Sequence, residues 1–172
     1  MEIRKLEPSD DRSGFSCGDG DLDRFFRKYA GQNQWRHYLG STYIATRDGV
    51  ILGFVTVSVG ELTTDKIAIA IRKKLPSYPI PVFRIARLGV ALRYQRQGVG
   101  SALLRAMLLA AVDLHEKIAC AGVVVDAKPE AAAFYEKLGF APLNLQSGWL
   151  GDRPQPASLF LPIGTIIQAI KG

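Results

Sequence analysis

The fold is decided by residues 93–101, which read Arg-Tyr-Gln-Arg-Gln-Gly-Val-Gly-Ser. An apolar run at residues 82–90 comes just before this stretch, and its β-branched and large apolar side chains are typical of a strand buried on both faces. After it, apolar residues from Val99 to Leu114 recur at steps of three and four, which predicts one buried face of a long helix. The predicted order is therefore strand, glycine-rich turn and helix.

The glycine-rich turn has the features of an anion site. Gly98 and Gly100 allow the backbone to approach a ligand closely, and the first N–H groups of the following helix lack intrahelical acceptors. The helix dipole adds to this, so we expect a pyrophosphate site. A Walker A loop would need Gly-Lys-Ser/Thr, and the dinucleotide fingerprint would need a glycine where Leu103 stands. The remaining alternative is a helix start that uses its glycines only for tight packing.

Two segments carry a resemblance to a known family. Gln95, Gly98 and Gly100 form a Gln-x-x-Gly-x-Gly pattern, which resembles the pyrophosphate arm of the GNAT acetyltransferases, a family that binds acetyl-coenzyme A. Residues 134–140, Phe-Tyr-Glu-Lys-Leu-Gly-Phe, resemble the helix-to-strand junction of the same family. The resemblance implies an α/β (α+β) GNAT fold in one domain over residues 1–172, with a mixed central sheet of about six to seven strands flanked by helices.

The resemblance also implies a role for each motif in acetyl transfer. Tyr135 would lie beside the thioester sulfur as general acid, because a phenol with a reference pKa of about 10 stays protonated at neutral pH and can donate to a thiolate. The cofactor would lie in a splay between the strand ending near Val90 and the strand ending near Asp126, where backbone N–H groups can hydrogen-bond the thioester oxygen. The residues expected to bind acetyl-CoA are Leu88, Gly89, Val90, Gln95, Arg96, Gln97, Gly98, Val99, Gly100, Ser101 and Phe134.

Further segments are similar to toxin-type GNATs of bacterial toxin–antitoxin pairs. They are Phe15-x-Cys17-Gly18, Leu22-Asp23-x-Phe25, Gln32-Asn33, Thr42-Tyr43, residues 79–82, Arg87-Leu88-x-Val90 and residues 159–162. Those toxins acetylate the free α-amine of aminoacyl-tRNA, block translation and are held inactive by a ribbon-helix-helix antitoxin, so the resemblance implies both partners. The chain departs from the pattern at residues 89–91, Gly-Val-Ala, where many relatives carry Ala-Val-Asp. This departure bears on local geometry and on substrate preference.

Charge and cysteine content are compatible with such an enzyme. The chain has 22 Lys and Arg against 16 Asp and Glu, a net charge of +6, which favours anionic partners such as coenzyme A or a nucleic acid. Ordinary solubility would explain the same balance. Cys17 and Cys120 are far apart and have no metal-like spacing, so we expect reduced thiols and no metal. Since no apolar leader or membrane-spanning stretch is found, we expect a cytoplasmic protein with no membrane partner.

The acceptor side is less well defined by the sequence. Arg24, Arg36 and Arg84 are the basic residues that we expect to contact substrate phosphates, through attraction that does not depend on base sequence. For each of them, an ordinary solvated surface charge is the alternative. No general base is selected, because the α-amine of an aminoacyl ester is less basic than a lysine side chain. The candidates considered for that role are His37, His115, Glu61 and Asp126.

Strand and helix signals alternate along the rest of the chain. We expect a hairpin with strands at 42–46 and 50–59, because an Asp-Gly pair between them favours the left-handed turn of a hairpin. We expect a helix from a cap at Asp19 or Asp21 to about Gly31. The other expected elements are strands at 2–6, 121–126, 140–143 and 158–161, helices at 61–75, 129–138 and 163–170, a substrate-facing segment at 32–37 and a turn-rich stretch at 144–156.

Three functions are compatible with these observations. The first is a toxin-like acetyltransferase acting on aminoacyl-tRNA. The second is a GNAT that acetylates a small-molecule or protein amine. The third is a non-catalytic module that binds acetyl-CoA or an antitoxin, against which Tyr135 and the intact turn argue. A second copy of the chain is a further candidate partner.

Overall fold

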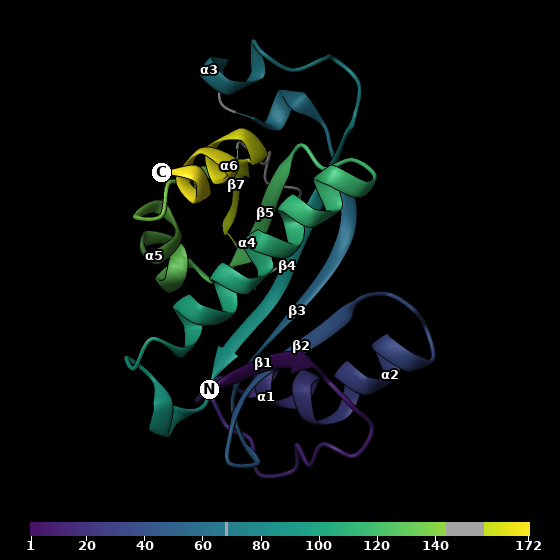
Figure 1. The fold of residues 1–172 in the computed structure, drawn as a ribbon, viewed down its shortest axis with the longest axis vertical. Coiled ribbons are helices and arrows are strands. Elements are labelled where there is room, and N and C mark those ends of the chain that lie inside the picture. Colours follow the sequence, from purple (N-terminus) through teal and green to yellow (C-terminus); the bar gives the residue numbers. More distant parts are fainter. Residues whose placement is uncertain (68, 144–156) are drawn as a thin grey trace, which may run out of the picture. The chain divides into compact units, whose positions relative to one another are not determined.

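The computed structural model describes residues 1–67, 69–143 and 157–172, and the turn-rich stretch predicted at 144–156 lies outside the described residues. Over the described residues, seven strands form one sheet in the order β1-β2-β3-β4-β5-β7-β6, flanked by helices (Figure 1). The predicted mixed sheet is thus confirmed. The chain divides into two compact units. The first unit comprises Met1–Ser58 and Ile85–Leu109, and the second comprises Val59–Arg84 and Ala110–Gly172.

The first unit contains the predicted hairpin. Strands β2 (Ser41–Arg47) and β3 (Val50–Leu62) pair antiparallel, and β1 (Glu2–Lys5) pairs with the other edge of β2. At the hairpin turn, Asp48 has a φ of 52° and Gly49 a φ of 76°, so both residues adopt the left-handed conformation that suits a two-residue hairpin. The Asp-Gly signal in the sequence is therefore confirmed.

The first helical segment is longer than the sequence suggested. It consists of α1 (Gly20–Arg24), a π-helical turn η1 (Phe25–Tyr29) and α2 (Ala30–Trp35). Asp19 caps it, because its side chain accepts from the backbone N–H groups of the first turn. The predicted end at Gly31 is wrong. The ring of Trp35 occupies the space that a Cβ at Gly31 would need, so this glycine serves packing inside the helix rather than termination.

The segment at 32–37 carries a buried structural residue. Gln34 is 8% exposed; its Nε2 donates to the carbonyl oxygen of Leu6 at 2.8 Å, and its Oε1 accepts from the N–H of Thr42 at 2.7 Å. The Gln34 amide therefore links Leu6, just after β1, to Thr42, near the start of β2. This residue of the predicted substrate-facing segment points inward.

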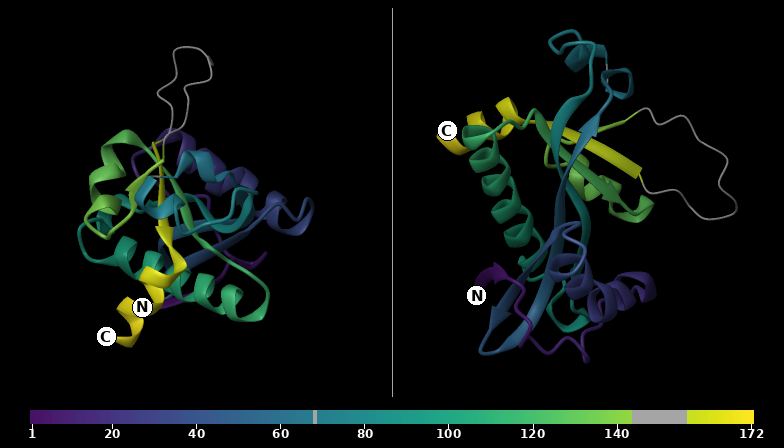
Figure 2. Two further views of the ribbon diagram at one scale, coloured as in Figure 1. Left: turned by 90° about the horizontal axis from the view of Figure 1, so that it is seen from above. Right: turned by 90° about the vertical axis from the view of Figure 1, so that its right-hand side faces the viewer.

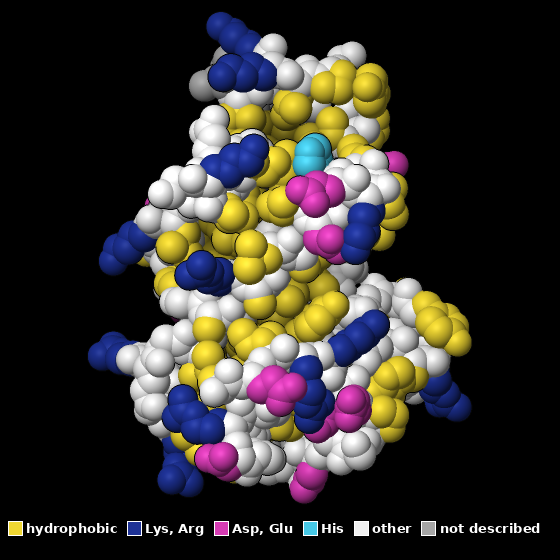
Figure 3. Space-filling view, viewed as in Figure 1, with side chains coloured by type: hydrophobic (Ala, Val, Ile, Leu, Met, Phe, Trp, Pro, Cys, Tyr) yellow, Lys and Arg dark blue, Asp and Glu magenta, His cyan; other side chains and the backbone are white. Residues whose placement is uncertain are grey.

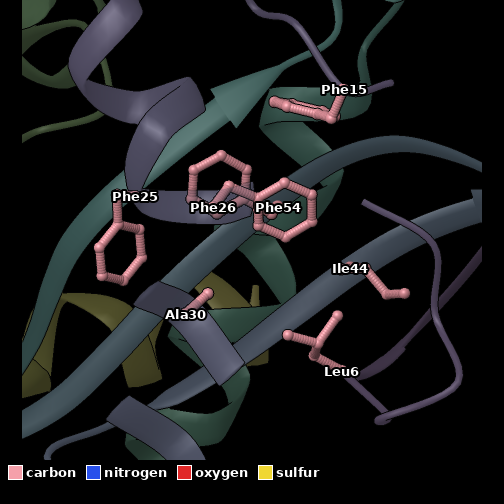
Figure 4. Close-up of a cluster of buried hydrophobic side chains, with 7 residues drawn as sticks. All are labelled: Leu6, Phe15, Phe25, Phe26, Ala30, Ile44 and Phe54. Atoms are coloured by element: carbon pink, nitrogen blue, oxygen red, sulfur yellow. The ribbon is translucent and has the colours of Figure 1, made fainter. Parts of the chain in front are cut away.

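An aromatic cluster forms the core of the first unit (Figure 4). The ring of Phe26 stacks on that of Phe54 at a centroid distance of 4.3 Å, and Phe15 meets both rings edge-on. Phe25, Leu6, Ala30 and Ile44 complete the cluster. The fully buried ring of Phe54 joins β3 to the helices that cover it.

Phe54→Ala is expected to lower the free energy of unfolding by about 3–5 kcal/mol, because it removes apolar area and leaves a cavity among three other rings. Urea denaturation followed by circular dichroism measures this change. Val50→Ala is the control on the same strand, since Val50 is 47% exposed and should cost less than about 0.5 kcal/mol. Equal losses in the two variants would contradict the assignment of the core.

The second unit contains an antiparallel group of strands. Strand β5 (Gly122–Ala127) pairs with β7 (Ala157–Pro162), which also pairs with the short β6 (Ala141–Pro142). Between β5 and β6 lie the 3₁₀ turn η4 (Pro129–Ala131) and α5 (Ala132–Glu136), and α6 (Ile163–Lys171) follows β7. Gly139, with a φ of 93°, ends the α5 region as predicted.

The predicted helix at 61–75 is wrong. Strand β3 continues to Leu62, and only a 3₁₀ turn η2 (Thr64–Lys66) and one helical turn α3 (Ile69–Arg72) follow. Leu62 and Ile67 are buried in an apolar cluster with Ile80, Val82, Val124 and Phe160. Packing on the sheet has thus overridden the local preference for a helix.

The strand and helix on either side of the glycine-rich turn are as predicted. They are β4 (Ile80–Val90) and α4 (Val99–Lys117), with a 3₁₀ turn η3 (Leu92–Tyr94) between them. Helix α4 runs without interruption in both views of Figure 2. Among the described residues, no helix is both long and apolar enough to cross a membrane. Both cysteines are free.

Candidate active site

The turn before α4 exposes a row of backbone N–H groups. Arg96 and Gly98 both lie in the left-handed region, with φ values of 60° and 82°, and a non-glycine residue there is uncommon. The first backbone bond into the helix runs from the N–H of Ala102 to the oxygen of Gly98, at 3.0 Å. Within the part of the chain that the structure describes, the N–H groups of residues 96–101 have no backbone acceptor. With the dipole of a 19-residue helix behind them, these donors suit a pyrophosphate.

The two glycines of the turn have different roles. Gly98 is required by its backbone conformation, since its φ is +82° and a Cβ there would meet no other atom. At Gly100, a Cβ would make only ordinary contacts, 3.5 Å from Cγ2 of Val90 and 3.8 Å from Cδ2 of Leu88. Packing therefore does not demand a glycine at position 100.

Two glutamine side chains hold the turn in place. Nε2 of Gln95 donates to the carbonyl oxygens of Cys17 at 2.9 Å and of Val90 at 3.0 Å, and Nε2 of Gln97 donates to that of Arg93 at 2.8 Å. These bonds tie the turn to the end of β4 and to the loop before α1. The amide nitrogens of both residues are thus engaged with the protein. Direct contact of Gln95 and Gln97 with acetyl-CoA stays a prediction.

Residues 89–91 lie against the aromatic core of the first unit. A Cβ at Gly89 would lie 2.8 Å from the ring of Phe54 and 3.4 Å from the sulfur of Cys17, so an alanine would not fit here without movement of its neighbours. Ala91, which is partly buried, packs against the same aromatic cluster. Burial raises the pKa of the Cys17 thiol to about 11, so this thiol is protonated at neutral pH and is not a nucleophile.

Tyr135 is held by aromatic neighbours in the second unit. Its ring meets those of Phe134 and Phe140 edge-on, at centroid distances of 5.1 and 5.6 Å, and only 5% of the residue is exposed. Burial raises the pKa of Tyr135 to about 12. Within the described residues its hydroxyl makes no hydrogen bond, and it is not fully enclosed. The site therefore offers a protonated phenol with a free donor.

The burial of Tyr135 predicts that its phenol loses its proton at a higher pH than an ordinary tyrosine does. The tyrosinate absorbance of the native protein should include a component with a midpoint near pH 12, because the charged form is poorly solvated at Tyr135. Tyr135→Phe should remove that component. Tyr38→Phe, which removes the hydroxyl of a residue that is 84% exposed, should leave this component in place. Persistence of the late component in Tyr135→Phe would contradict the assignment.

The three predicted acceptor-binding arginines lie in different surroundings. Arg24 is exposed and pairs with Asp21 in the same helix at 3.4 Å, and Arg36 is exposed at the end of α2. Both are exposed, as ordinary surface charges are. In the space-filling view of Figure 3, Lys and Arg side chains are dark blue and are interspersed with side chains of other kinds within each part of the chain. Arg84, in the second unit, differs: it lies beside Asp126, and its Nε is buried without a hydrogen-bond partner.

The candidate general bases also differ in how exposed they are. His37, Glu61 and His115 are exposed, and Nδ1 of His115 lies 3.1 Å from the carbonyl oxygen of Cys120 at the end of α4. Asp126 is mostly buried and accepts a hydrogen bond from Ser158. Sequence reasoning did not single out Ser158, because its partner lies on a strand whose pairing the sequence does not reveal. Among the described residues, no group of three or more His, Cys, Asp or Glu could hold a metal ion.

Comparison with known proteins identifies the family. Residues 39–142 match the model of the acetyltransferase (GNAT) domain. The chain belongs to the GNAT acetyltransferases. It is therefore an acetyltransferase, and the fold implied by the two motifs is confirmed.

Named relatives and solved structures are similar to most of this chain. A protein of Mycobacterium tuberculosis (strain ATCC 25618 / H37Rv) named tRNA-acetylating toxin is 32% identical over 140 residues, which cover 80% of this chain and 82% of that protein. The structure of AtaT complexed with acetyl-methionyl-tRNAfMet superposes with a TM-score of 0.82 at 24% identity, over 98% of each chain. A tyrosine-to-phenylalanine mutant of AtaT, bound to the C-terminus of the antitoxin AtaR and acetyl-CoA, gives a TM-score of 0.77 at 21% identity, over 99% of this chain and 98% of that one.

Proposed function

We propose that this protein transfers the acetyl group of acetyl-CoA to the α-amine of aminoacyl-tRNA and thereby blocks translation as a toxin. The observation that carries the chemistry is the buried phenol of Tyr135, which stays protonated and has a free donor. The acceptor is supported by the 32% identity to a tRNA-acetylating toxin over most of both chains. The net charge of +6 suits an anionic acceptor.

In this proposal the protein moves one proton for each acetyl group. The neutral amine attacks the thioester carbon, and a nitrogen–carbon bond forms while the carbon–sulfur bond breaks. Tyr135 donates its phenolic proton to the departing sulfur, which leaves as the free thiol of coenzyme A. The new amide nitrogen gives up one proton, which returns to the phenolate. With a pKa of about 12, Tyr135 regains that proton readily.

The backbone supplies the other interactions of the proposed site. The free N–H groups of residues 96–101 would bind the pyrophosphate at the start of α4. Backbone N–H groups near residues 88–90 would hydrogen-bond the thioester oxygen as negative charge develops there. Phe134, which is 39% exposed, would lie against the pantetheine. We propose that residues 1–172 act as one acetyltransferase domain.

Partners and location follow from the same proposal. The relative that binds acetyl-CoA was solved with the C-terminus of its antitoxin, and we propose an antitoxin of the ribbon-helix-helix class for this chain as well. Since aminoacyl-tRNA and acetyl-CoA meet in the cytoplasm, we propose that the protein acts there. A homodimer stays a candidate assembly.

Labelled acetyl-CoA tests the acceptor directly. The purified protein should transfer label to aminoacyl-tRNA and not to the same tRNA after deacylation, because only the charged form carries an α-amine. Free lysine and a lysine-containing peptide at equal concentration should be poor acceptors. Label on the free amines but not on aminoacyl-tRNA would instead support the small-molecule or protein acetyltransferase. No transfer to any amine would support a non-catalytic module.

A further inference from the structure

A polar row crosses three strands of the second unit. Arg84 lies on β4, Asp126 on β5 and Ser158 on β7. The residues two positions away on the same side of these strands belong to the apolar cluster, namely Val82 before Arg84 on β4, Val124 before Asp126 on β5 and Phe160 after Ser158 on β7. Since residues two apart share a face of a strand, the row continues this cluster along the sheet. Arg84, Asp126 and Ser158 therefore form a polar row that borders the apolar cluster on this face of the sheet.

The row is only partly paired within itself. Oγ of Ser158 donates to Oδ1 of Asp126 at 3.0 Å, and the two residues lie opposite each other in the register of β5 and β7. Nη1 of Arg84 lies 3.6 Å from Oδ2 of Asp126, which is close enough for an ion pair and too far for a hydrogen bond. Nε of Arg84 is buried and has no hydrogen-bond partner. A buried donor without an acceptor is rare and calls for an explanation.

Both charged side chains keep a part open to a ligand. The Asp126 side chain is 23% exposed and that of Arg84 is 42% exposed. The carboxylate can accept more bonds than the one from Ser158, and the guanidinium has five N–H donors. Nη1 of Arg84 lies 3.6 Å from Oδ2 of Asp126, and its Nε has no hydrogen-bond partner, so the guanidinium can still donate to a ligand. The row thus offers an acceptor and a donor side by side.

We propose that this row binds the aminoacyl end of the acceptor, an inference that rests on the proposed function. Asp126 accepts a hydrogen bond from the α-amine, and Arg84 donates to the carbonyl oxygen of the ester. In an aminoacyl ester the amine and the carbonyl are separated by a single carbon, which suits neighbouring groups on β5 and β4. The substrate class selected is therefore an amine next to a carbonyl, and an isolated amine would leave Arg84 without an acceptor.

The ion pair also bears on the reactivity of the amine. A lone carboxylate beside the α-amine would favour the ammonium form, which cannot attack a thioester. The positive charge of Arg84, 3.6 Å from Asp126, offsets that effect. The pair can therefore orient the amine while most of its charge is neutralised. This account requires no residue of the row to act as the general base.

Two variants test the row with the purified full chain. Asp126→Asn keeps the shape and the bond from Ser158, and it should raise the KM for aminoacyl-tRNA by about 10- to 100-fold, since a hydrogen bond to a charged group is lost. Arg84→Lys keeps the charge but loses the planar donors. It should lower the rate with an amino-acid methyl ester at least tenfold more than the rate with an alkylamine of similar basicity. The affinity for acetyl-CoA should not change in either variant.

Asp113→Asn is the matched control, because Asp113 is an exposed carboxylate paired with Lys117 at 2.7 Å, and its loss should leave all rates unchanged. Ser158→Ala, which removes only the bond that orients Asp126, is a milder variant in case Asp126→Asn unfolds. If the wild type acetylates aminoacyl-tRNA but both row variants affect ester and alkylamine equally, the row is structural and the inference is overturned. If the wild type acetylates only other amines, the proposed function fails, whereas the ratio between ester and alkylamine still decides the role of the row.

Discussion

Tyr135→Phe is expected to lower kcat by about 100- to 10,000-fold, with little change in the KM for acetyl-CoA. The variant loses one oxygen atom, and with it the only group that we propose as proton donor to the departing sulfur. The hydroxyl makes no hydrogen bond with the described residues, so its removal leaves no partner unpaired. The ring contacts with Phe134 and Phe140 remain possible. The expected result is therefore a folded protein that binds its cofactor and barely turns over.

The measurement combines steady-state kinetics with a binding assay and a growth test. Calorimetric titration should give the same affinity for acetyl-CoA in wild type and variant. Induced expression in a bacterium should arrest growth for the wild type only. Tyr38→Phe, at a residue that is 84% exposed, controls for the loss of a phenol elsewhere and should behave as wild type. A fall in kcat of less than about fivefold would remove Tyr135 from the chemistry.

The two motifs that imply the family were readable because their signals are local. A strand, a glycine-rich turn and a helix follow directly from apolar spacing and from Gly98 and Gly100, and the structure has them at β4, η3 and α4. The hairpin turn was readable for the same reason, since its Asp-Gly pair needs no tertiary partner to favour a left-handed turn. Local chemistry thus predicts where the chain turns.

The errors arose where distant residues decide the local structure. Gly31 ends no helix, because the Trp35 ring fills the space beside it. Residues 61–75 were expected to form a helix, yet Leu62 and Ile67 are buried against strands β4, β5 and β7. The polar row of the second unit depends on the pairing of β5 with β7, which a single sequence does not contain. Contacts of this kind become visible only in the folded chain.

The role of Gln95 illustrates a third situation. A motif glutamine was expected to bind the cofactor, and in the structure its amide nitrogen donates to the carbonyls of Cys17 and Val90. Asp23 in turn holds the segment that contains Cys17. Its Oδ1 accepts a hydrogen bond from the backbone N–H of Cys17 at 2.8 Å, and its Oδ2 accepts one from Oγ of Ser16 at 3.0 Å. Gln95 thus shapes the turn, and its contact with the cofactor stays a prediction.

Gly100→Asp is expected to weaken acetyl-CoA binding by about a hundredfold. The added carboxylate would stand at the start of α4, next to the N–H groups that we propose for the pyrophosphate. Two like charges about 5 Å apart repel by about 3 kcal/mol at the effective dielectric constant near a protein surface. The fold should tolerate the change, because a Cβ at Gly100 makes only ordinary contacts and an acidic residue is favourable in the first turn of a helix.

Two control variants separate the effect of the added charge from the effect of its position in the chain. Gly100→Ala adds the same Cβ without the charge, and it should weaken binding far less than Gly100→Asp if repulsion is the cause. Gly164→Asp puts a carboxylate at the same position of another helix, α6, where a Cβ meets no atom, and it should leave the affinity unchanged. Calorimetric titration with acetyl-CoA and thermal unfolding of each variant provide the data. If Gly100→Asp kept wild-type affinity, the anion would have to bind elsewhere, and the free N–H groups of residues 96–101 would need another ligand.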